Sequence, residues 1–283
     1  MDLRDDAARA YGRVLSKDVL VEGTHFLPTD PLDLLAQKAL RVNMSDLIAK
    51  GATPEAYMLG IVWPKRLDEA AFSQFAEGLD RDQKAHGLQL LGGDTTRGEA
   101  LVISVTMFGA PCGDRPILRS GGRPGDCLCV SGTIGDGFLG LQAALAGDEQ
   151  GAGAFHLPKP PFGAERSVAA YAQASLDVSD GLIADARHLA KESGLALRIR
   201  AEAVPLSDTG RRYAENKQLT DLFTGGDDYQ TLCLVGADDV RKMSGFTVIG
   251  EVIANGVAGT VETVLPDGRV WQTEAGGWDH FAQ

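Results

Sequence analysis

The chain has 283 residues, 44% of them hydrophobic, which is enough to bury the core of one large or two ordinary domains. Its 27 basic and 39 acidic residues give a formal net charge of −12, and this charge argues against nonspecific binding of nucleic acid or of an anionic membrane. No apolar run approaches the roughly 20 residues of a membrane span, and the first residues lack the basic start and apolar core of a signal peptide. We therefore expect a cytoplasmic protein in which cations bridge any anionic substrate to an acidic site.

The four cysteines do not form a recognisable framework. Cys127 and Cys129 lie two residues apart in an expected strand, and Cys112 and Cys233 lie elsewhere in the chain. Four scattered thiols are too few for a disulfide scaffold, and a zinc site would need two further ligands near the first pair. We expect buried, reduced thiols instead.

The first part of the chain alternates strand-like and helical patterns. Pro31 marks the start of a helix, on which Leu35, Ala39 and Val42 recur along one apolar stripe. Asp46 falls on the same stripe, so its carboxylate is expected in the core or at its rim. The order of elements predicts a mixed α/β or α+β domain, with strands at 14–26, 57–63, 88–91 and 101–108 and helices at 31–50 and 67–85.

A Gly-Gly-Asp sequence follows the apolar run 88–91, which predicts a buried strand. Asp94, two threonines and the N–H groups of Gly92 and Gly93 would then lie at the tip of two strands, where they could hold a metal–phosphate complex. A tight hairpin turn uses the same residue types, so both interpretations stay open for this stretch alone. The pattern recurs at Gly225-Gly226-Asp227, at a later loop-to-strand junction.

The second part of the chain begins after a segment rich in Gly, Pro and Arg at 111–126, where we expect a domain boundary. The predicted domains are residues 1–112 and an α/β domain of residues 113–283. Residues 132–137 form neither a P-loop nor a dinucleotide-binding fingerprint, and 147–162 is expected to be a surface loop. The remaining elements are predicted as strands at 127–131, 195–200, 229–235 and 246–253 and helices at 138–146, 182–190, 207–216 and 238–243.

Nine aspartates stand at turns or on apolar stripes rather than on solvated faces. Each one alone is more often a helix cap or a turn residue. Together they would raise one another's pKa unless cations intervened, and Mg²⁺ is the natural cation because it is shared between carboxylates and phosphates. The pattern favours metal–nucleotide chemistry without a P-loop. The nine are Asp5, Asp6, Asp18, Asp46, Asp94, Asp177, Asp180, Asp227 and Asp228.

Seven motifs, in this order, resemble those of thiamine-monophosphate kinase, a branch of the aminoimidazole ribonucleotide synthetase superfamily. The resemblance runs from about residue 3 to the end of the chain. The motifs are Asp5-Asp6-Ala7-Ala8, Asp18-Val19-Leu20-Val21-Glu22-Gly23-Thr24-His25-Phe26, Asn43-Met44-Ser45-Asp46-Leu47, Gly92-Gly93-Asp94-Thr95-Thr96, Arg119-Ser120-Gly121, Asp177-Val178-Ser179-Asp180-Gly181-Leu182 and Gly225-Gly226-Asp227-Asp228-Tyr229.

The resemblance implies a two-domain fold whose N-terminal sheets pair in a homodimer. It implies direct transfer of the γ-phosphoryl group of ATP onto thiamine monophosphate, with ATP and Mg²⁺ required and no nucleic acid or membrane partner. The implied Mg²⁺ ligands are Asp6, Ser16, Asp18, Asp46, Asp94, Asp177 and Asp180. The implied ATP contacts are Gly93, Asp94, Arg119 and Ser179, and the implied substrate contacts are His25, Asp227 and Trp278.

Two positions depart from the family pattern. Lys17 stands where the family usually has Thr, and Asp227 stands where it usually has Glu. The alternatives are another ATP-dependent enzyme of the superfamily, of the selenophosphate synthetase or aminoimidazole ribonucleotide synthetase type, and a non-catalytic Mg–nucleotide-binding protein. A selenophosphate synthetase would need a catalytic Cys or selenocysteine near its start, and no Cys precedes Cys112.

Overall fold

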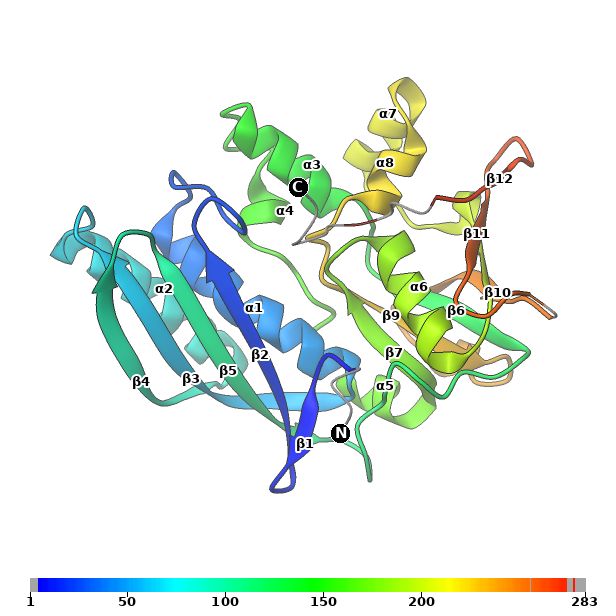
Figure 1. Cartoon of the computed structure of the whole chain (residues 1–283), viewed down its shortest axis with the longest axis horizontal. Helices are drawn as coiled ribbons and strands as arrows, with labels where there is room; N and C mark the ends of the chain where they lie inside the picture. Colours follow the sequence, from blue (N-terminus) through cyan, green and yellow to red (C-terminus); the bar gives the residue numbers. More distant parts are fainter. Residues whose placement is uncertain (1–4, 255, 274–276, 278–283) are drawn as a thin grey trace.

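The computed structural model describes residues 5–254, 256–273 and 277, and it contains two sheets that lie side by side (Figure 1). The first sheet has five strands in the order β1-β2-β5-β3-β4, and the second has seven in the order β12-β11-β8-β10-β6-β9-β7. Helices accompany both sheets, so the expected mixed α/β fold is confirmed. Within the described ranges, no helix has the length and apolar character that a membrane span requires.

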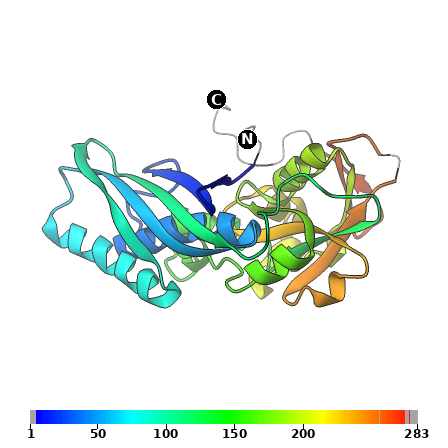
Figure 2. The ribbon, with the colours of Figure 1, turned by 90° about the horizontal axis from the view of Figure 1, so that it is seen from below.

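The first sheet carries both of its helices on one face. Its elements are β1 (Ala8–Ala10), β2 (Arg13–Val21), α1 (Leu32–Ala49), β3 (Ala52–Pro64), α2 (Glu69–His86), β4 (Gln89–Gly98) and β5 (Val102–Pro111). Figure 2 shows α1 and α2 below the sheet, with its opposite face left open by them. The predicted helices are confirmed. The second of them, α2, begins after Asp68, which accepts a hydrogen bond from the N–H of Ala71, and ends at Gly87 in the left-handed region, where glycine is favoured.

The second sheet is built from residues after 125. Its strands and helices are β6 (Asp126–Ser131), α3 (Asp136–Leu145), α4 (Gly153–His156), α5 (Glu165–Tyr171), β7 (Ala172–Val178), α6 (Leu182–Ser193), β8 (Leu197–Arg200), α7 (Asp208–Asn216), α8 (Leu219–Thr224), β9 (Gln230–Gly236), β10 (Phe246–Val252), β11 (Val261–Val264) and β12 (Val270–Trp271). One core cluster packs β6, β7, β8 and β9 against α6 and α8. The division of the chain near residue 112 stays a prediction.

Helix α1 lies between the two sheets and is buried on nearly every side (Figure 1). Its apolar residues pack on the first sheet, and the helix also contacts β7, β9, α4 and α5 of the second part. The predicted apolar stripe is therefore correct, but it describes only one side of the helix. Charged residues are buried as well, namely Lys38 and Asp46 on the helix and Lys50 at its C-cap.

Three predicted elements were wrong. Strand β4 continues through the Gly-Gly-Asp sequence, and Leu90 and Leu91 on it are 42% and 54% exposed, because β4 lies at the edge of the sheet. Gly93 is needed there, since a Cβ atom would lie 1.8 Å from the carbonyl oxygen of Leu59.

The expected loop 147–162 contains α4, whose Phe155 and His156 are buried. The expected helix 238–243 is only a 3₁₀ turn, Val240–Lys242.

A buried ion pair joins the two helices of the first sheet. The guanidinium group of Arg41 on α1 donates to both carboxylate oxygens of Asp82 on α2, at 2.7 and 3.0 Å, and the Asp82 side chain is 2% exposed. We predict that Arg41→Met lowers the free energy of unfolding by about 3 kcal/mol, because it strands a buried carboxylate. Urea denaturation measures this loss.

Lys84→Met is the matched control, because it removes an exposed pair with Asp80 on the same helix. Its cost should stay below about 1 kcal/mol. Equal losses in the two variants would contradict a special role for the buried pair.

Candidate active site

An acidic cluster lies where α1 meets the second sheet. Carboxylate oxygens of Asp6, Asp46 and Asp177 all lie within 4.8 Å of one another, an arrangement that could hold a metal ion. They come from the segment before β1, from α1 and from the end of β7. The charge of Asp18 on β2 also acts on Asp46 and Asp177. Four carboxylates expected from the sequence as Mg²⁺ ligands are therefore neighbours in the fold.

Burial and mutual repulsion dominate the electrostatics of this cluster. Burial raises the pKa of Asp18 to about 6 and that of Asp177 to about 7. Burial also raises the pKa of Asp46 well above its ordinary value, and Asp177, Asp18 and Asp6 add to that shift. Ser45 on α1 donates a 2.5 Å hydrogen bond to Asp177 and opposes part of its shift. A divalent cation between such carboxylates would favour their ionised form, and carboxylate oxygens are the ligands that Mg²⁺ prefers.

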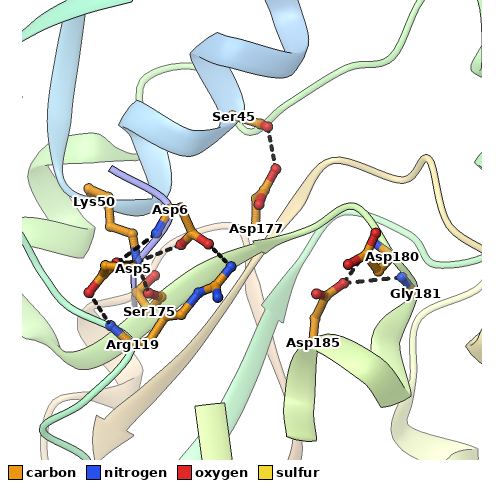
Figure 3. A network of polar contacts seen from close by, with 10 residues as sticks. All are labelled: Asp5, Asp6, Ser45, Lys50, Arg119, Ser175, Asp177, Asp180, Gly181 and Asp185. Carbon is orange, nitrogen blue, oxygen red and sulfur yellow. Dashed lines mark hydrogen bonds and ion pairs between the residues drawn. The ribbon is translucent and has the colours of Figure 1, made fainter. Parts of the chain in front are cut away.

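Two basic side chains pair with the carboxylates of Asp5 and Asp6 (Figure 3). The ammonium group of Lys50, 1% exposed, lies 2.5 Å from Asp5, 2.6 Å from Asp6 and 2.5 Å from the carbonyl oxygen of Ser175. Arg119 pairs with Asp6 through its guanidinium group and donates its backbone N–H to Asp5 at 3.0 Å. Burial would raise the pKa of Asp6, but these two cations hold it below its ordinary value.

Lys50 lies one helical turn after Asp46, a spacing at which the two side chains could pair. Among the described ion pairs Lys50 joins Asp5 and Asp6 instead. The lysine is buried against these two carboxylates. Asp46 keeps its position beside Asp177 and Asp6, and this position supports a cation between the three.

Asp46 and Asp177 of the cluster line one end of a cleft of about 600 Å³. Asp18, Asp46, Asp177, Ser179 and Asp180 line that end. The other end lies around Lys38, which precedes Asp46 by about two turns of α1 and contacts the lining residues Asp227, His25 and Phe155. The aromatic and apolar side chains that line the cleft include Val21, His25, Phe26, Leu27, Phe138, Leu141, Phe155 and Tyr229. The cleft thus has an acidic end suited to metal-bound phosphates and an apolar end suited to an organic group.

The other predicted site residues do not all lie in the cleft. His25 lines the cleft, and its Nδ1 accepts a 3.0 Å hydrogen bond from the N–H of Val21, which leaves Nε2 to carry the proton of the neutral ring. Ser16 is buried, and its hydroxyl donates to the backbone and side-chain oxygens of Asn43. That hydroxyl is engaged with α1 rather than with the carboxylates. Trp278 lies outside the described residues.

Gly93 and Asp94 lie apart from the cleft, on β4. Asp94 is aligned with Gly60 of β3, whose neighbours Leu59 and Ile61 face the helices, so the Asp94 side chain faces the open side of the sheet. Strands β5 and β3 separate it from Asp18, which is a distance of roughly 14 Å at the usual strand spacing. The structure therefore does not bring Asp94 to the acidic cluster of its own chain.

Sequence reasoning missed Lys38, Phe155 and Tyr229, which lie at or under the apolar end of the cleft. Lys38 could have been found, because it is spaced four and eight residues before Val42 and Asp46 and so lies on their face of the helix. Phe155 could not, since its segment looked like a loop. The Asp227-Asp228-Tyr229 motif contained the tyrosine, but no feature of it predicted that the ring is buried.

The fold is of the AIR synthase type. The family model "AIR synthase related protein, N-terminal domain" matches residues 4–110. Hydrogenase maturation protein HypE shares the fold, with a TM-score of 0.76 at 17% identity over 99% of this chain and 94% of that one. This likeness establishes the architecture alone.

More similar relatives identify the branch. The thiamine-monophosphate kinase of Caulobacter vibrioides is 42% identical over 84% of this chain and 72% of its own length, and that of Escherichia coli is 38% identical over 95% and 86%. The solved structure of AaThiL complexed with AMPPCP and TMP has a TM-score of 0.89 at 32% identity, covering 99% of this chain and 92% of that one. The chain belongs to the thiamine-monophosphate kinase family and is a kinase.

The raised pKa values of the acidic cluster predict how stability depends on pH without metal. A carboxyl group whose pKa is higher in the folded state binds more protons there, so its stabilising effect is lost as pH rises through that pKa. In a chelator, stability should therefore fall between roughly pH 4 and pH 7, the interval from the ordinary value of 3.8 to about 7 for Asp177. Asp46→Asn should reduce this fall, and added Mg²⁺ should reverse it only in the unmodified protein.

Thermal unfolding at several pH values, with and without Mg²⁺, measures both effects. The variant should be at least as stable as the unmodified protein at pH 7 in chelator, because one buried charge has been removed. Curves that fall equally steeply in the two proteins would show that Asp46 carries no buried charge.

Proposed function

We propose that this kinase transfers the γ-phosphoryl group of ATP directly, in line, onto the phosphate of thiamine monophosphate. The bond from the γ-phosphorus to ADP breaks, and a bond to an oxygen of the acceptor phosphate forms, giving ADP and thiamine diphosphate. The single observation that carries the proposal is the cleft with an acidic end and an apolar end. The complex of AaThiL with AMPPCP and TMP supports it.

The residues of the cleft suit this chemistry. A phosphate oxygen is already a nucleophile, so the protein needs to position two anions and offset their charge rather than remove a proton. Asp6, Asp18, Asp46 and Asp177 would hold Mg²⁺, which when bound neutralises phosphate oxygens and so lets the two anions approach. Arg119 pairs with Asp6 and would position that carboxylate.

The apolar end of the cleft would take the organic part of the substrate. Thiamine monophosphate has a cationic thiazolium ring and an aminopyrimidine ring, and aromatic side chains such as Phe138 and Phe155 offer faces for both. His25 and Asp227 supply the polar groups of this end. The arrangement orients the acceptor phosphate toward the acidic cluster.

A direct assay tests the proposal. With ATP, Mg²⁺ and thiamine monophosphate, we expect ADP and thiamine diphosphate in equal amounts, and no product in chelator. Asp46→Asn should lower kcat at least ~100-fold, because it removes charge at the phosphate end of the cleft. Asp80→Asn, at an exposed position of α2, is the control and should keep full activity. Formation of ADP without thiamine diphosphate would contradict the proposal.

We also propose that the open face of the first sheet forms a two-fold dimer interface. Val19 and Met58 on that face are 45% and 47% exposed, and an uncovered apolar sheet face is typical of a partner site. Asp94 lies on the same face, away from the cleft of its own chain. In a dimer it would contribute to the cleft of the partner, which accounts for its place among the implied Mg²⁺ ligands.

Mixed dimers test this arrangement. Asp46→Asn and Asp94→Asn should each be nearly inactive as homodimers. A heterodimer isolated with two affinity tags should regain roughly half of the unmodified activity, because one of the two sites in a two-fold dimer then has both aspartates. A monomer in light scattering at micromolar concentration, or a heterodimer as inactive as its parents, would count against the proposal.

A further inference from the structure

Lys38 lies beneath the apolar end of the cleft and contacts three residues that line it. The side chain comes from the buried face of α1 and is 1% exposed. Its ammonium group lies 3.6 Å from Asp227, 3.4 Å from the carbonyl oxygen of His25 and 3.7 Å from the centre of the Phe155 ring. These three residues belong to separate segments, and each lines the cleft. One buried charge therefore fixes their relative positions.

Asp227 is held from two sides. Lys38 faces its Oδ2 atom, and the hydroxyl of Tyr229 donates a 2.8 Å hydrogen bond to its Oδ1 atom. The backbone is fixed as well, because the N–H of Asp227 donates to Ser179 at 2.9 Å and that of Tyr229 donates to Val178 at 2.7 Å. The side chain is still 26% exposed. A carboxylate of fixed direction therefore reaches the cleft.

We propose that Lys38 and Tyr229 form a buried clamp that positions Asp227 to accept an N–H hydrogen bond from the organic part of the substrate. Lys38 and Tyr229 are positioning residues, because they act through Asp227. This inference rests on the proposed function and identifies a group that selects the organic part of the substrate. The matching group on thiamine monophosphate is the amine of its pyrimidine ring.

Because Lys38 is paired with Asp227, we expect this carboxylate to recognise a hydrogen-bond donor rather than a cation. Lys38 offsets the charge of Asp227, so the pair attracts a cation less than a lone carboxylate would. Each carboxylate oxygen can accept more than one hydrogen bond, so the exposed part of Asp227 can accept one from a donor in the cleft. Burial lowers the pKa of Lys38, whereas the nearby carboxylates of Asp227 and Asp30 oppose that shift. Asp30 in turn pairs with His156 of α4, since its Oδ1 atom lies 3.1 Å from Nε2 of the histidine.

Steady-state kinetics with each substrate varied in turn tests the clamp. Lys38→Met keeps the length of the side chain but removes the ammonium group, and we expect the KM for thiamine monophosphate to rise roughly tenfold or more while the KM for ATP changes less than threefold. Tyr229→Phe should show the same selectivity with a smaller rise. Calorimetric titration with thiamine monophosphate measures binding independently of turnover.

Arg41→Met is the matched control, since it removes another paired basic side chain of α1 that does not line the cleft. It should lose stability yet keep the KM for thiamine monophosphate. Lys38→Met combined with Asp227→Asn should be no worse than Asp227→Asn alone, because the two groups act as a unit. If Lys38→Met does not fold, Tyr229→Phe decides the question.

A substrate analogue tests the hydrogen bond itself. Oxythiamine monophosphate has a carbonyl oxygen in place of the pyrimidine amine, so it should have a kcat/KM at least ~100-fold lower than thiamine monophosphate. Asp227→Asn should reduce that ratio, because an amide can donate as well as accept. Equal use of both compounds by the unmodified protein, or equal rises in both KM values in the clamp variants, would overturn the clamp. A protein that makes no thiamine diphosphate would instead overturn the proposed function.

Discussion

The structure depends on the burial of charge along α1. Lys38, Asp46 and Lys50 lie on a helix that is enclosed by the first sheet on one side and by the second part of the chain on the other. A buried charge without a partner is costly, so each of them requires an opposite charge brought by another segment. Lys50 forms ion pairs with Asp5 and Asp6, and Lys38 forms one with Asp227. The seam between the two sheets is therefore fixed by ion pairs as well as by apolar packing.

The order of these charges along the helix gives the cleft its two ends. Lys38 precedes Asp46 by eight residues, which is about 12 Å at the helical rise per residue. The lysine neutralises the single carboxylate of the apolar end, whereas Asp46 adds to the negative charge of the other end. Metal-bound phosphates and an organic ring system are thus directed to opposite ends by one helix. This arrangement sacrifices stability for function, because the repelling carboxylates gain nothing from being buried until a cation joins them.

The sequence predicted this fold and site unevenly, for physical reasons. Helical periodicity located α1 and placed Asp46 on its buried face, because one face of a helix is enough to define a stripe. It failed at β4, where Leu90 and Leu91 look like a core strand but lie on an exposed edge. Local patterns do not reveal which strand is outermost. The acidic cluster could be predicted as a set of residue types and a resemblance, yet the Lys50–Asp6 pair joins segments that only the tertiary fold brings together.

Backbone geometry explains the aspartate at position 227. Its φ angle of 67° lies in the left-handed region, which Asp and Asn adopt more readily than longer side chains such as Glu. Tyr229, two residues further on, also has a positive φ, of 52°, so the loop turns sharply before β9. This turn lets the shorter acid reach both Lys38 and the tyrosine hydroxyl. A Glu here would place its carboxyl group one methylene further on, where the lysine and the hydroxyl no longer meet it in the same geometry. The departure from the family pattern is therefore consistent with the clamp rather than a loss of the site.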